Sequence, residues 1–600
     1  MNLFKIKLLF ILVIGSVLIF TACDDDNDNN NNSLVSCEPA ENECEENQHC
    51  QQINIDEAFC LDQCIPGEEN TCPENFICQR SDADTNLCIP LCDVTEEDSC
   101  GEGWSCNPVV LEGENGICQQ ICSPENNECP DGEVCIPDED DNYFCEAECN
   151  PNQINACGEE FSCELRLDGF YGCYKSVYIQ GMVINSTTGD PILAAHIMGV
   201  DKTGTSCSDV AVSDASGIYQ LSVPVTRDET GALAEGTFTL RASAANYEVF
   251  PHGIRMAMPI DYSLAISTEE GWSINNSLTK IALIPLPAEE QGLGMVTGQI
   301  ITDATSTVNP AGVLVVLETE SGSDMPFGFS DLQGNYTIFN VPENDYEARG
   351  YKAGLQLDAT AVQMVGSALV ENINLYQSQT PLNTVSGNIN IVDPGDGEST
   401  SVVLVPESTF NEISGKGVVP AGLRAPAPPE APSITGSFTI EGVPDGNYIV
   451  LAAFENDYLV QDPDPNISGT EIVHIAIPDQ DNRDLELATA FKITGALTIV
   501  SPGADGSPEA VEEPVSFIFA DDSSEDGYTV VVYNAFGDEV WRDDTLPPVQ
   551  GSATVEVPYE GPALQTGMYY QFRAMSTKSG DPLSITEDLL GVFYIPVQIQ

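Results

Sequence analysis

Cysteine is the residue whose spacing carries the clearest chemistry in this chain of 600 residues, which has 22 cysteines. Twenty of them form five sets of four, each spaced C-x6/7-C-x5-C-x9/11-C, with three residues between sets. The even count and the short repeat favour two disulfides in each set, with all three possible pairings open. Zinc ligation is the alternative, but no C-x2-C pair occurs, so we predict no metal here. The sets are Cys37, Cys44, Cys50 and Cys60; Cys64, Cys72, Cys78 and Cys88; Cys92, Cys100, Cys106 and Cys118; Cys122, Cys129, Cys135 and Cys145; and Cys149, Cys157, Cys163 and Cys173.

These repeats of 27 to 30 residues are too small to fold on apolar burial alone, so cross-links must stabilise them. They resemble the EGF-like and related cysteine-rich repeats of secreted proteins and bacterial surface lipoproteins. They lack the six cysteines and the C-x-C step of a true EGF module, so no calcium site is carried over. Loose Ca²⁺ binding by clustered acids stays open beside the interpretation as a solvated acidic face. We predict that the aromatic residues two positions before the third cysteine fill the small cores, with a row for stacking against a ligand as the alternative: Phe76, Trp104 and Phe161.

The first 23 residues carry a second chemical signal. Lys5 and Lys7 precede an apolar run, residues 8–20, which suits a signal peptide better than a membrane span of about 20 residues. The run ends in Phe20-Thr-Ala-Cys23, which resembles the lipobox of bacterial lipoproteins, with Phe20 in place of the usual Leu. The resemblance implies cleavage before Cys23 and acylation of that residue, which would anchor the chain in a membrane. An ordinary secretory peptide is the alternative.

Charge excludes one class of partner. The chain has 95 acidic and 19 basic side chains, for a formal charge of −76, so phosphate backbones are repelled and we predict no binding to nucleic acid. The Asp- and Asn-rich stretch after Cys23 has no apolar residue before Leu34 and reads as a flexible tether. A chelating role for these acids is the alternative, but ordering a flexible tether opposes tight binding.

Beyond Tyr174 the sequence alternates apolar and polar residues between Gly, Pro, Asn and Asp, which predicts antiparallel β sandwiches. An Asp-x-x-Gly-x-Tyr motif occurs at Asp214 to Tyr219 and at Asp331 to Tyr336, and a degenerate copy ends at Phe438. The motif predicts a hairpin in which the glycine takes a positive φ and the aromatic side chain enters the core. Prolines then end the strand: Pro224, Pro342 and Pro444.

These motifs resemble the carboxypeptidase regulatory-like domain, a transthyretin-like β sandwich. The resemblance implies a non-catalytic spacer or binding module, since peptidase chemistry belongs to a separate zinc domain with an H-x-x-E pair, which is absent here. Farther along, residues 528–533 and 567–573 read as strands, with Trp541 just past a turn at Gly537. This part resembles a fibronectin type III or immunoglobulin-like domain. Cys207 has no partner in the cysteine count, which predicts a buried thiol, with an intermolecular bridge as the alternative.

No sequence motif indicates catalysis. The chain has no G-x-S-x-G elbow, no phosphate-binding loop ending in Gly-Lys and no H-E-x-x-H. Its four histidines are scattered over three predicted modules, so we interpret each as a surface or structural residue: His49, His196, His252 and His474. We therefore predict no catalytic residue and no cofactor, with a hydrolase acting on peptides or glycans as a distant alternative.

Together these patterns predict a mostly β multidomain protein, with small disulfide-rich repeats followed by tandem antiparallel β sandwiches. We expect a lipid-anchored protein of the bacterial cell envelope, at the outer membrane or cell surface, that binds an extracellular protein or glycan. A structural scaffold without a specific ligand is the alternative. The predicted parts are a signal peptide, 1–22; a tether, 23–36; five cysteine-rich repeats, 37–174; regulatory-like sandwiches, 175–290 and 291–380; a degenerate third sandwich, 381–488; and a fibronectin type III or immunoglobulin-like sandwich, 489–600.

Overall fold

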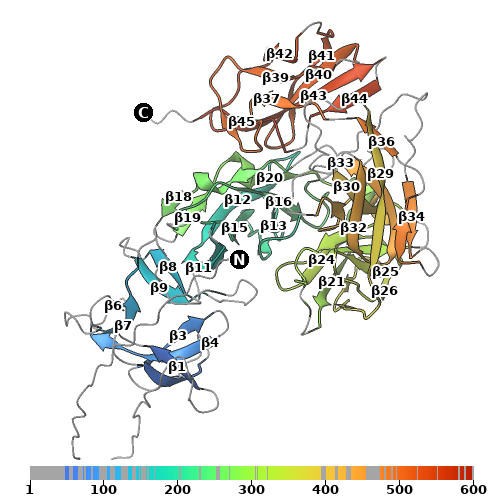
Figure 1. The fold of residues 1–600 in the computed structure, drawn as a ribbon. Coiled ribbons are helices and arrows are strands. Elements are labelled where there is room, and N and C mark those ends of the chain that lie inside the picture. The colour runs from blue at the N-terminus through green and yellow to red at the C-terminus, as the bar shows by residue number, and fades with distance from the viewer. Residues whose placement is uncertain are drawn as a thin grey trace, which may run out of the picture. The chain divides into compact units, whose positions relative to one another are not determined.

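The fold was described from a computed structural model of the chain (Figure 1). The structure describes residues 48–52, 58–64, 72, 76–82, 85–93, 100, 104–108, 115–122, 133–137, 143–147, 149, 157, 161–167, 169–201, 204–228, 231–251, 257–268, 271–303, 306, 308–319, 322–392, 401–411, 417–427, 434, 436–453, 473–478, 482–487, 491–494, 496–522, 525–549, 552–578, 581–586 and 589–596. The chain divides into two compact units, residues 1–79 with 86–119 and residues 80–85 with 120–600. None of the described helices is long and apolar enough to cross a membrane.

The described chain is built from strands and short 3₁₀ turns, and its N-terminal part is rich in disulfides, which confirms the predicted fold class. The cysteine-rich part consists of short antiparallel strands, most of them paired as hairpins. They are β1 (Gln48–Gln52), β2 (Ala58–Asp62), β3 (Phe76–Asp82), β4 (Thr85–Pro90), β5 (Cys92–Asp93), β6 (Trp104–Pro108), β7 (Asn115–Gln120), β8 (Glu133–Pro137), β9 (Tyr143–Ala147), β10 (Phe161–Leu165) and β11 (Tyr171–Lys175).

A first sandwich follows, with one sheet in the order β15-β12-β19-β18, β20 also pairing with β12, and a second sheet in the order β14-β13-β16-β17. Strand β12 runs parallel to β19 and β20 and antiparallel to β15. Its strands are β12 (Val177–Asn185), β13 (His196–Val200), β14 (Ala211–Val212), β15 (Ile218–Val223), β16 (Thr237–Ser243), β17 (Ile260–Asp261), β18 (Ile266–Thr268), β19 (Gly271–Ile274) and β20 (Lys280–Leu283).

Two further sandwiches repeat this arrangement of sheets, with the first strand parallel to the last two and antiparallel to the fourth. The second contains β21 (Gly294–Ile301), β22 (Leu314–Glu318), β23 (Phe327–Phe329), β24 (Asn335–Val341), β25 (Asn344–Tyr351), β26 (Thr360–Met364), β27 (Leu369–Val370) and β28 (Leu375–Tyr376). The third contains β29 (Asn383–Val392), β30 (Ser401–Pro406), β31 (Arg424–Ala425), β32 (Ser437–Val443), β33 (Gly446–Ala453), β34 (Val473–Ile477), β35 (Asp484–Glu486) and β36 (Phe491–Thr494).

The fourth sandwich has a different strand order, β37-β39-β42 in one sheet and β38-β45-β43-β40-β41 in the other, with β44 on β43. Trp541 follows the predicted turn at Gly537 and packs beside Phe517 and Tyr559. Its strands are β37 (Ile499–Ser501), β38 (Glu509–Ala510), β39 (Ser516–Ala520), β40 (Gly527–Asn534), β41 (Glu539–Leu546), β42 (Thr554–Pro558), β43 (Tyr569–Lys578), β44 (Asp581–Ile585) and β45 (Val592–Tyr594). The 3₁₀ turns are η1 (Tyr262–Leu264), η2 (Ser277–Thr279), η3 (Ala288–Glu290) and η4 (Glu407–Thr409).

The predicted Asp-x-x-Gly hairpin forms as expected in the first sandwich. Gly217 has φ +73°, and the Asp214 carboxylate accepts hydrogen bonds from the N–H groups of Ser216 and Ile218. Tyr219 is 2% exposed, and its hydroxyl donates to the carbonyl of Thr279 at 2.7 Å, which ties the hairpin to the last part of the sandwich. A side chain at Gly181 would collide with the same carbonyl, because an added Cβ would lie 1.9 Å from it.

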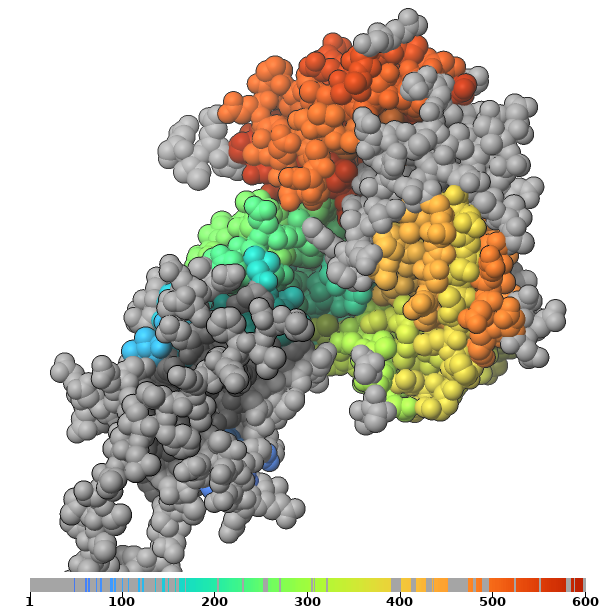
Figure 2. Space-filling view, viewed as in Figure 1, coloured from blue at the N-terminus to red at the C-terminus, as the bar shows by residue number. Residues whose placement is uncertain are grey.

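The second and third sandwiches share an apolar cluster, in addition to the separate core of the second sandwich. Val315 and Leu317 of β22, and Val313 just before it, point into the second sandwich, because they cluster with its other buried residues. The alternate residues Leu314 and Val316 instead cluster with the core of the third sandwich. Both faces of β22 are therefore buried, and the two sandwiches form one continuous surface in the space-filling view (Figure 2).

The last cysteine-rich repeat is joined to the first sandwich by a buried hydrogen-bonded pair, Arg227 and Glu164. Arg227 Nε donates to Glu164 Oε2 at 2.6 Å, and Arg227 Nη2 donates to the carbonyl of Lys175 at 2.9 Å. The guanidinium also lies 4.9 Å from the ring centre of Tyr174. Burial raises the pKa of Glu164 to about 8, because loss of water around the carboxylate outweighs the attraction of the guanidinium.

Candidate functional site

Disulfides form the centres of the cysteine-rich repeats, and their pairing is now visible. Where both bonds of a set are described, the first cysteine bonds the third and the second bonds the fourth. The other two described bonds follow the same rule. The six bonds are Cys72–Cys88, Cys92–Cys106, Cys100–Cys118, Cys122–Cys135, Cys149–Cys163 and Cys157–Cys173. Cys60, Cys64 and Cys145 are also disulfide-bonded.

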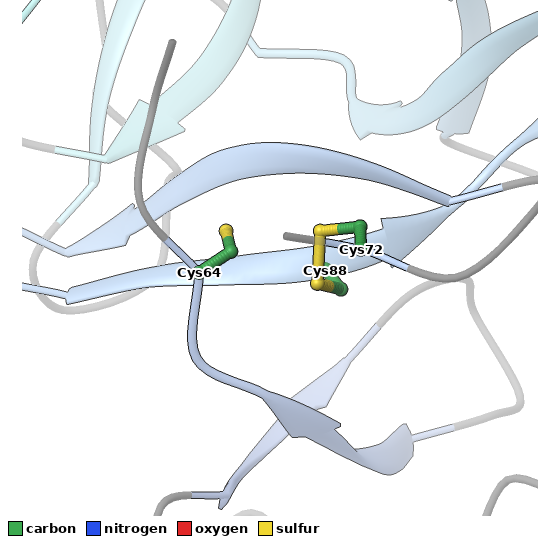
Figure 3. Close-up of side chains that lie close together, drawn as sticks. All are labelled: Cys64, Cys72 and Cys88. Carbon is green, nitrogen blue, oxygen red and sulfur yellow. A yellow bond between two sulfur atoms is a disulfide. The ribbon is translucent and has the colours of Figure 1, made fainter. Parts of the chain in front are cut away.

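Strand register explains why the four cysteines of a set lie close together. The third and fourth cysteines stand opposite each other on the two strands of a hairpin, as in Cys163 and Cys173. Directly opposed residues point to the same face, so the first two cysteines can reach them side by side from the preceding segment. Figure 3 shows the result in the second set, where the sulfur of Cys64 lies beside the Cys72–Cys88 bond. Three groups of sulfur atoms lie within 4.8 Å of one another, but all belong to disulfides and offer no thiolate to a metal.

Several predicted site residues lie outside the described part of the chain. These are Cys23, Cys37, Cys44 and Cys129, and of Cys50 and Cys78 only the backbone is described. The predicted core role of Phe161 is wrong, since this side chain is 42% exposed. On β10 the face carrying Glu164 is the one buried against the first sandwich, so the face carrying Phe161 points outward. Phe76 is half-buried, and the side chain of Trp104 is outside the described set.

The histidines give no common site among the described residues. His196 lies on β13 of the first sandwich and His474 on β34 of the third, where it contacts Glu407 at 3.0 Å. His252 is outside the described residues, and of His49 only the backbone is described. Cys207 is a free, half-buried cysteine whose burial raises the pKa of its thiol to about 12, which keeps it unreactive near neutral pH.

Successive sandwiches meet at two equivalent joints. At the first joint the N–H of Asn246 donates to Asn340 Oδ1 at 2.6 Å, and Asn340 Nδ2 donates to the carbonyl of Tyr247 at 2.8 Å. At the second joint the N–H of Gly354 donates to the carbonyl of Gly442 at 2.8 Å. All four joint residues have positive φ, from +57° to +79°, so both joints use the same backbone geometry.

The candidate site is a cavity of 230 Å³ at the first joint. The outer face of the first sandwich lines it with His196, Met198, Arg241 and Ser243, and the second sandwich adds the strand end at Phe327 to Phe329. These residues come from strands more than 80 positions apart in the sequence. The cavity lies between the outer face of β13 and β16 and the second sandwich, which the joint at Asn246 and Asn340 holds beside that face.

Both apolar and polar groups shape this cavity. The guanidinium of Arg241 lies 3.4 Å from the ring centre of Phe329, a cation–π contact that fixes both side chains. The His196 ring meets Phe339 edge to face, with centres 5.0 Å apart. Burial lowers the pKa of His196, so its imidazole is neutral at pH 7 and carries one donor and one acceptor nitrogen. Such a site can bind a small ring with a polar end.

A second cavity of 470 Å³ lies where the first three sandwiches meet. Lys352 and Arg424 line it together with Glu441. Lys352 Nζ already donates to the carbonyls of Asn309 and Ala311, at 2.8 and 2.7 Å. Burial lowers the pKa of Lys352 to about 8. Because the Lys352 ammonium is committed to these carbonyls, we treat this cavity as part of the packing between sandwiches.

Sequence reasoning identified His196 but assigned it no ligand, and it missed Arg241, Ser243 and Phe327. Alignment of the repeats could have shown that His196 on β13 is polar where the matching Leu314 on β22 is apolar. That the second sandwich lies over this face follows only from the three-dimensional joint.

Comparisons with known proteins name no family. No family model matches the chain, and no curated protein matches it. The TIE protein of Bacillus anthracis is similar over 71% of this chain and 70% of that one, with 13% identity and a TM-score of 0.12. A streptococcal ancillary pilin is 13% identical over 53% of this chain and 99% of that one, with a TM-score of 0.14. The major pilin subunit BcpA of Bacillus cereus is 11% identical with the same coverage and TM-score. At these TM-scores the likeness supports no conclusion about function here.

Proposed function

We propose that this chain is a non-catalytic binding protein of the bacterial cell envelope, anchored by lipid on Cys23. Its sandwiches would bind an extracellular protein or glycan, and the cysteine-rich repeats would form the stalk that carries them. The observation that carries the proposal is the first joint, where fixed hydrogen bonds hold open a cavity lined by aromatic and polar side chains. Preformed concave sites of this composition are typical of ligand binding.

The stalk supports the same proposal. Disulfides replace an apolar core in the repeats, which suits an oxidising space outside the cytoplasm. The buried pair of Glu164 and Arg227 joins the last repeat to the first sandwich, as expected of a stalk that carries the sandwiches. The charge of −76 keeps such a chain soluble and disfavours nucleic acid as a partner.

Lipid labelling and protease shaving test the proposal together. Cells expressing the chain are labelled with an alkyne fatty acid, and intact cells are then treated with protease. We expect label on the wild-type chain, no label on Cys23→Ala, and cleavage of the sandwiches on intact cells. Persistent labelling of Cys23→Ala contradicts the anchor. Complete protection from protease contradicts surface exposure and favours the alternative of an internal envelope scaffold.

A further inference from the structure

One cross-strand pair in the first sandwich occupies the same position, relative to its joint, as a cross-strand pair in the second sandwich. Across β13 and β16, His196 pairs with Ser243, and across β22 and β25, Leu314 pairs with Tyr351. In both sheets the neighbouring strand residue points inward, Ile197 in the first sandwich and Val315 in the second. Ser243 therefore stands on the first sandwich where Tyr351 stands on the second.

At the second joint a phenol ring fills the space above this position. Tyr351 is 1% exposed, and its ring meets that of Tyr448 in the third sandwich edge to face, with centres 5.7 Å apart. Its hydroxyl donates to Glu318 Oε1 at 2.6 Å, so the polar end of the ring has a partner although it is buried.

At the first joint serine replaces that tyrosine, and the space beside it is the cavity of 230 Å³. A cavity of about 150 Å³ is enough to hold a benzene ring in an apolar core. Met198, Phe327 and Phe329 supply walls for a ring, and thioether sulfur packs favourably against aromatic rings. The imidazole of His196 can exchange a hydrogen bond with a hydroxyl at the edge of the ring.

We propose that this cavity binds the phenol ring of a tyrosine side chain on a partner polypeptide, in the position that Tyr351 occupies at the second joint. The inference rests on the proposed binding function and names the chemistry of its partner. The chain itself supplies the precedent, since the same register position is filled by a tyrosine one sandwich later. An acidic phosphotyrosine is disfavoured by the negative charge of the chain.

Ligand-observed NMR on the full chain carrying Cys23→Ala tests the proposal. The probes are N-acetyl-tyrosinamide, N-acetyl-phenylalaninamide and a panel of neutral methyl glycosides, each at millimolar concentration. We expect saturation transfer to the tyrosine probe, weaker transfer to the phenylalanine probe and none to the glycosides. Ser243→Tyr should fill the cavity from within, lower the affinity for the tyrosine probe at least tenfold and raise the Tm.

The matched control is Ser267→Tyr, on the exposed strand β18 of the same sandwich, which should leave probe affinity unchanged. Phe327→Ala, which removes one wall, is the second variant should Ser243→Tyr fail to fold, and it should also weaken binding. Equal binding by the wild type, Ser243→Tyr and Phe327→Ala overturns the inference, as does absence of binding to the tyrosine probe. Binding of a glycoside in its place, lost in Ser243→Tyr, assigns the cavity to a glycan and overturns the tyrosine assignment. Labelling and shaving of cells are independent of these outcomes, so the two proposals fail separately.

Discussion

The cysteine-rich repeats and the sandwiches solve the same problem of stability in opposite ways. In a repeat such as Cys149 to Cys173, two neighbouring disulfides occupy the place of a core. In the sandwiches the apolar core is large enough to run from one domain into the next, as Leu314 and Tyr448 show. In the repeats, covalent bonds lower the conformational entropy of the unfolded chain. In the sandwiches, stability depends on apolar side chains buried between neighbouring domains. The stalk should therefore respond to redox chemistry and the sandwiches to changes in packing.

Reduction of the disulfides should produce the largest difference in stability between the two regions. Each of the six described disulfides joins residues 13 to 18 positions apart and contributes about 3 kcal/mol, so loss of the bonds should unfold the repeats. We expect dithiothreitol to open residues 37–174 to proteolysis while the sandwiches keep their cleavage resistance, as followed by mass spectrometry of fragments. Equal loss of protection in both regions would contradict the distinction.

Packing substitutions should affect only the sandwiches. Leu314 is fully buried between the second and third sandwiches, so Leu314→Ala should lower the free energy of unfolding by about 2–5 kcal/mol. Leu369→Ala is the matched control, because Leu369 on β27 is 50% exposed and should change stability little. Urea denaturation under oxidising conditions measures both variants, and similar midpoints for the two would show that Leu314 is not part of a shared core.

The junction between stalk and sandwiches should depend on pH. The pKa of Glu164 is raised in the folded chain, so the folded state keeps a proton that the unfolded state releases. The contribution of Glu164 to stability at this junction should be complete below pH 4.5, fall by up to about 1.4 kcal/mol per pH unit between pH 4.5 and pH 8, and then level off. Hydrogen exchange of residues 161–175 at pH 5, 7 and 9, corrected for intrinsic rates, measures this change. Glu164→Gln should remove the slope, and an unchanged slope in that variant would assign it to another group.

The side chain of Asn340 should contribute to the free energy of unfolding through the hydrogen bonds of the first joint. Asn340→Gly keeps the positive φ but loses the side-chain hydrogen bonds to residues 244–247, at a cost of about 1–2 kcal/mol. Asn340→Ala adds the strain of a positive φ and should cost more. Thermal unfolding of the two variants separates the hydrogen bonds from the backbone strain, and equal Tm values for both variants and the wild type would contradict the role of Asn340.

Local motifs made the hairpins predictable, because each depends on residues close in sequence. Gly334 has φ +81° and Tyr336 is 3% exposed, as the Asp-x-x-Gly-x-Tyr motif indicates. The strand that follows each motif ends directly before a proline, as predicted, and this end too depends on a residue close in sequence: Pro224, Pro342 and Pro444. The predicted domain boundaries and the lipid on Cys23 stay predictions.

Features that depend on two distant segments could not be derived in the same way. Cysteine spacing allows three pairings, and the pairing observed depends on how the segment that carries the first two cysteines of a set lies against the hairpin that carries the other two, such as Cys163 and Cys173. The exposure of Phe161 follows from which face of β10 meets the first sandwich. The cavity needs His196 and Phe327 to meet across a joint, and nothing local in either segment indicates that meeting.

Hydrogen exchange across the shared core tests the central claim most directly, namely that the second and third sandwiches are stabilised as one body. Tyr448 lies in the third sandwich and is fully buried against Tyr351. Tyr448→Ala, compared with the exposed-site control Tyr376→Ala, should accelerate exchange of the amides of β22 in the second sandwich as well as those of β33, while β40 in the fourth sandwich stays unchanged. Faster exchange confined to the third sandwich would contradict the account.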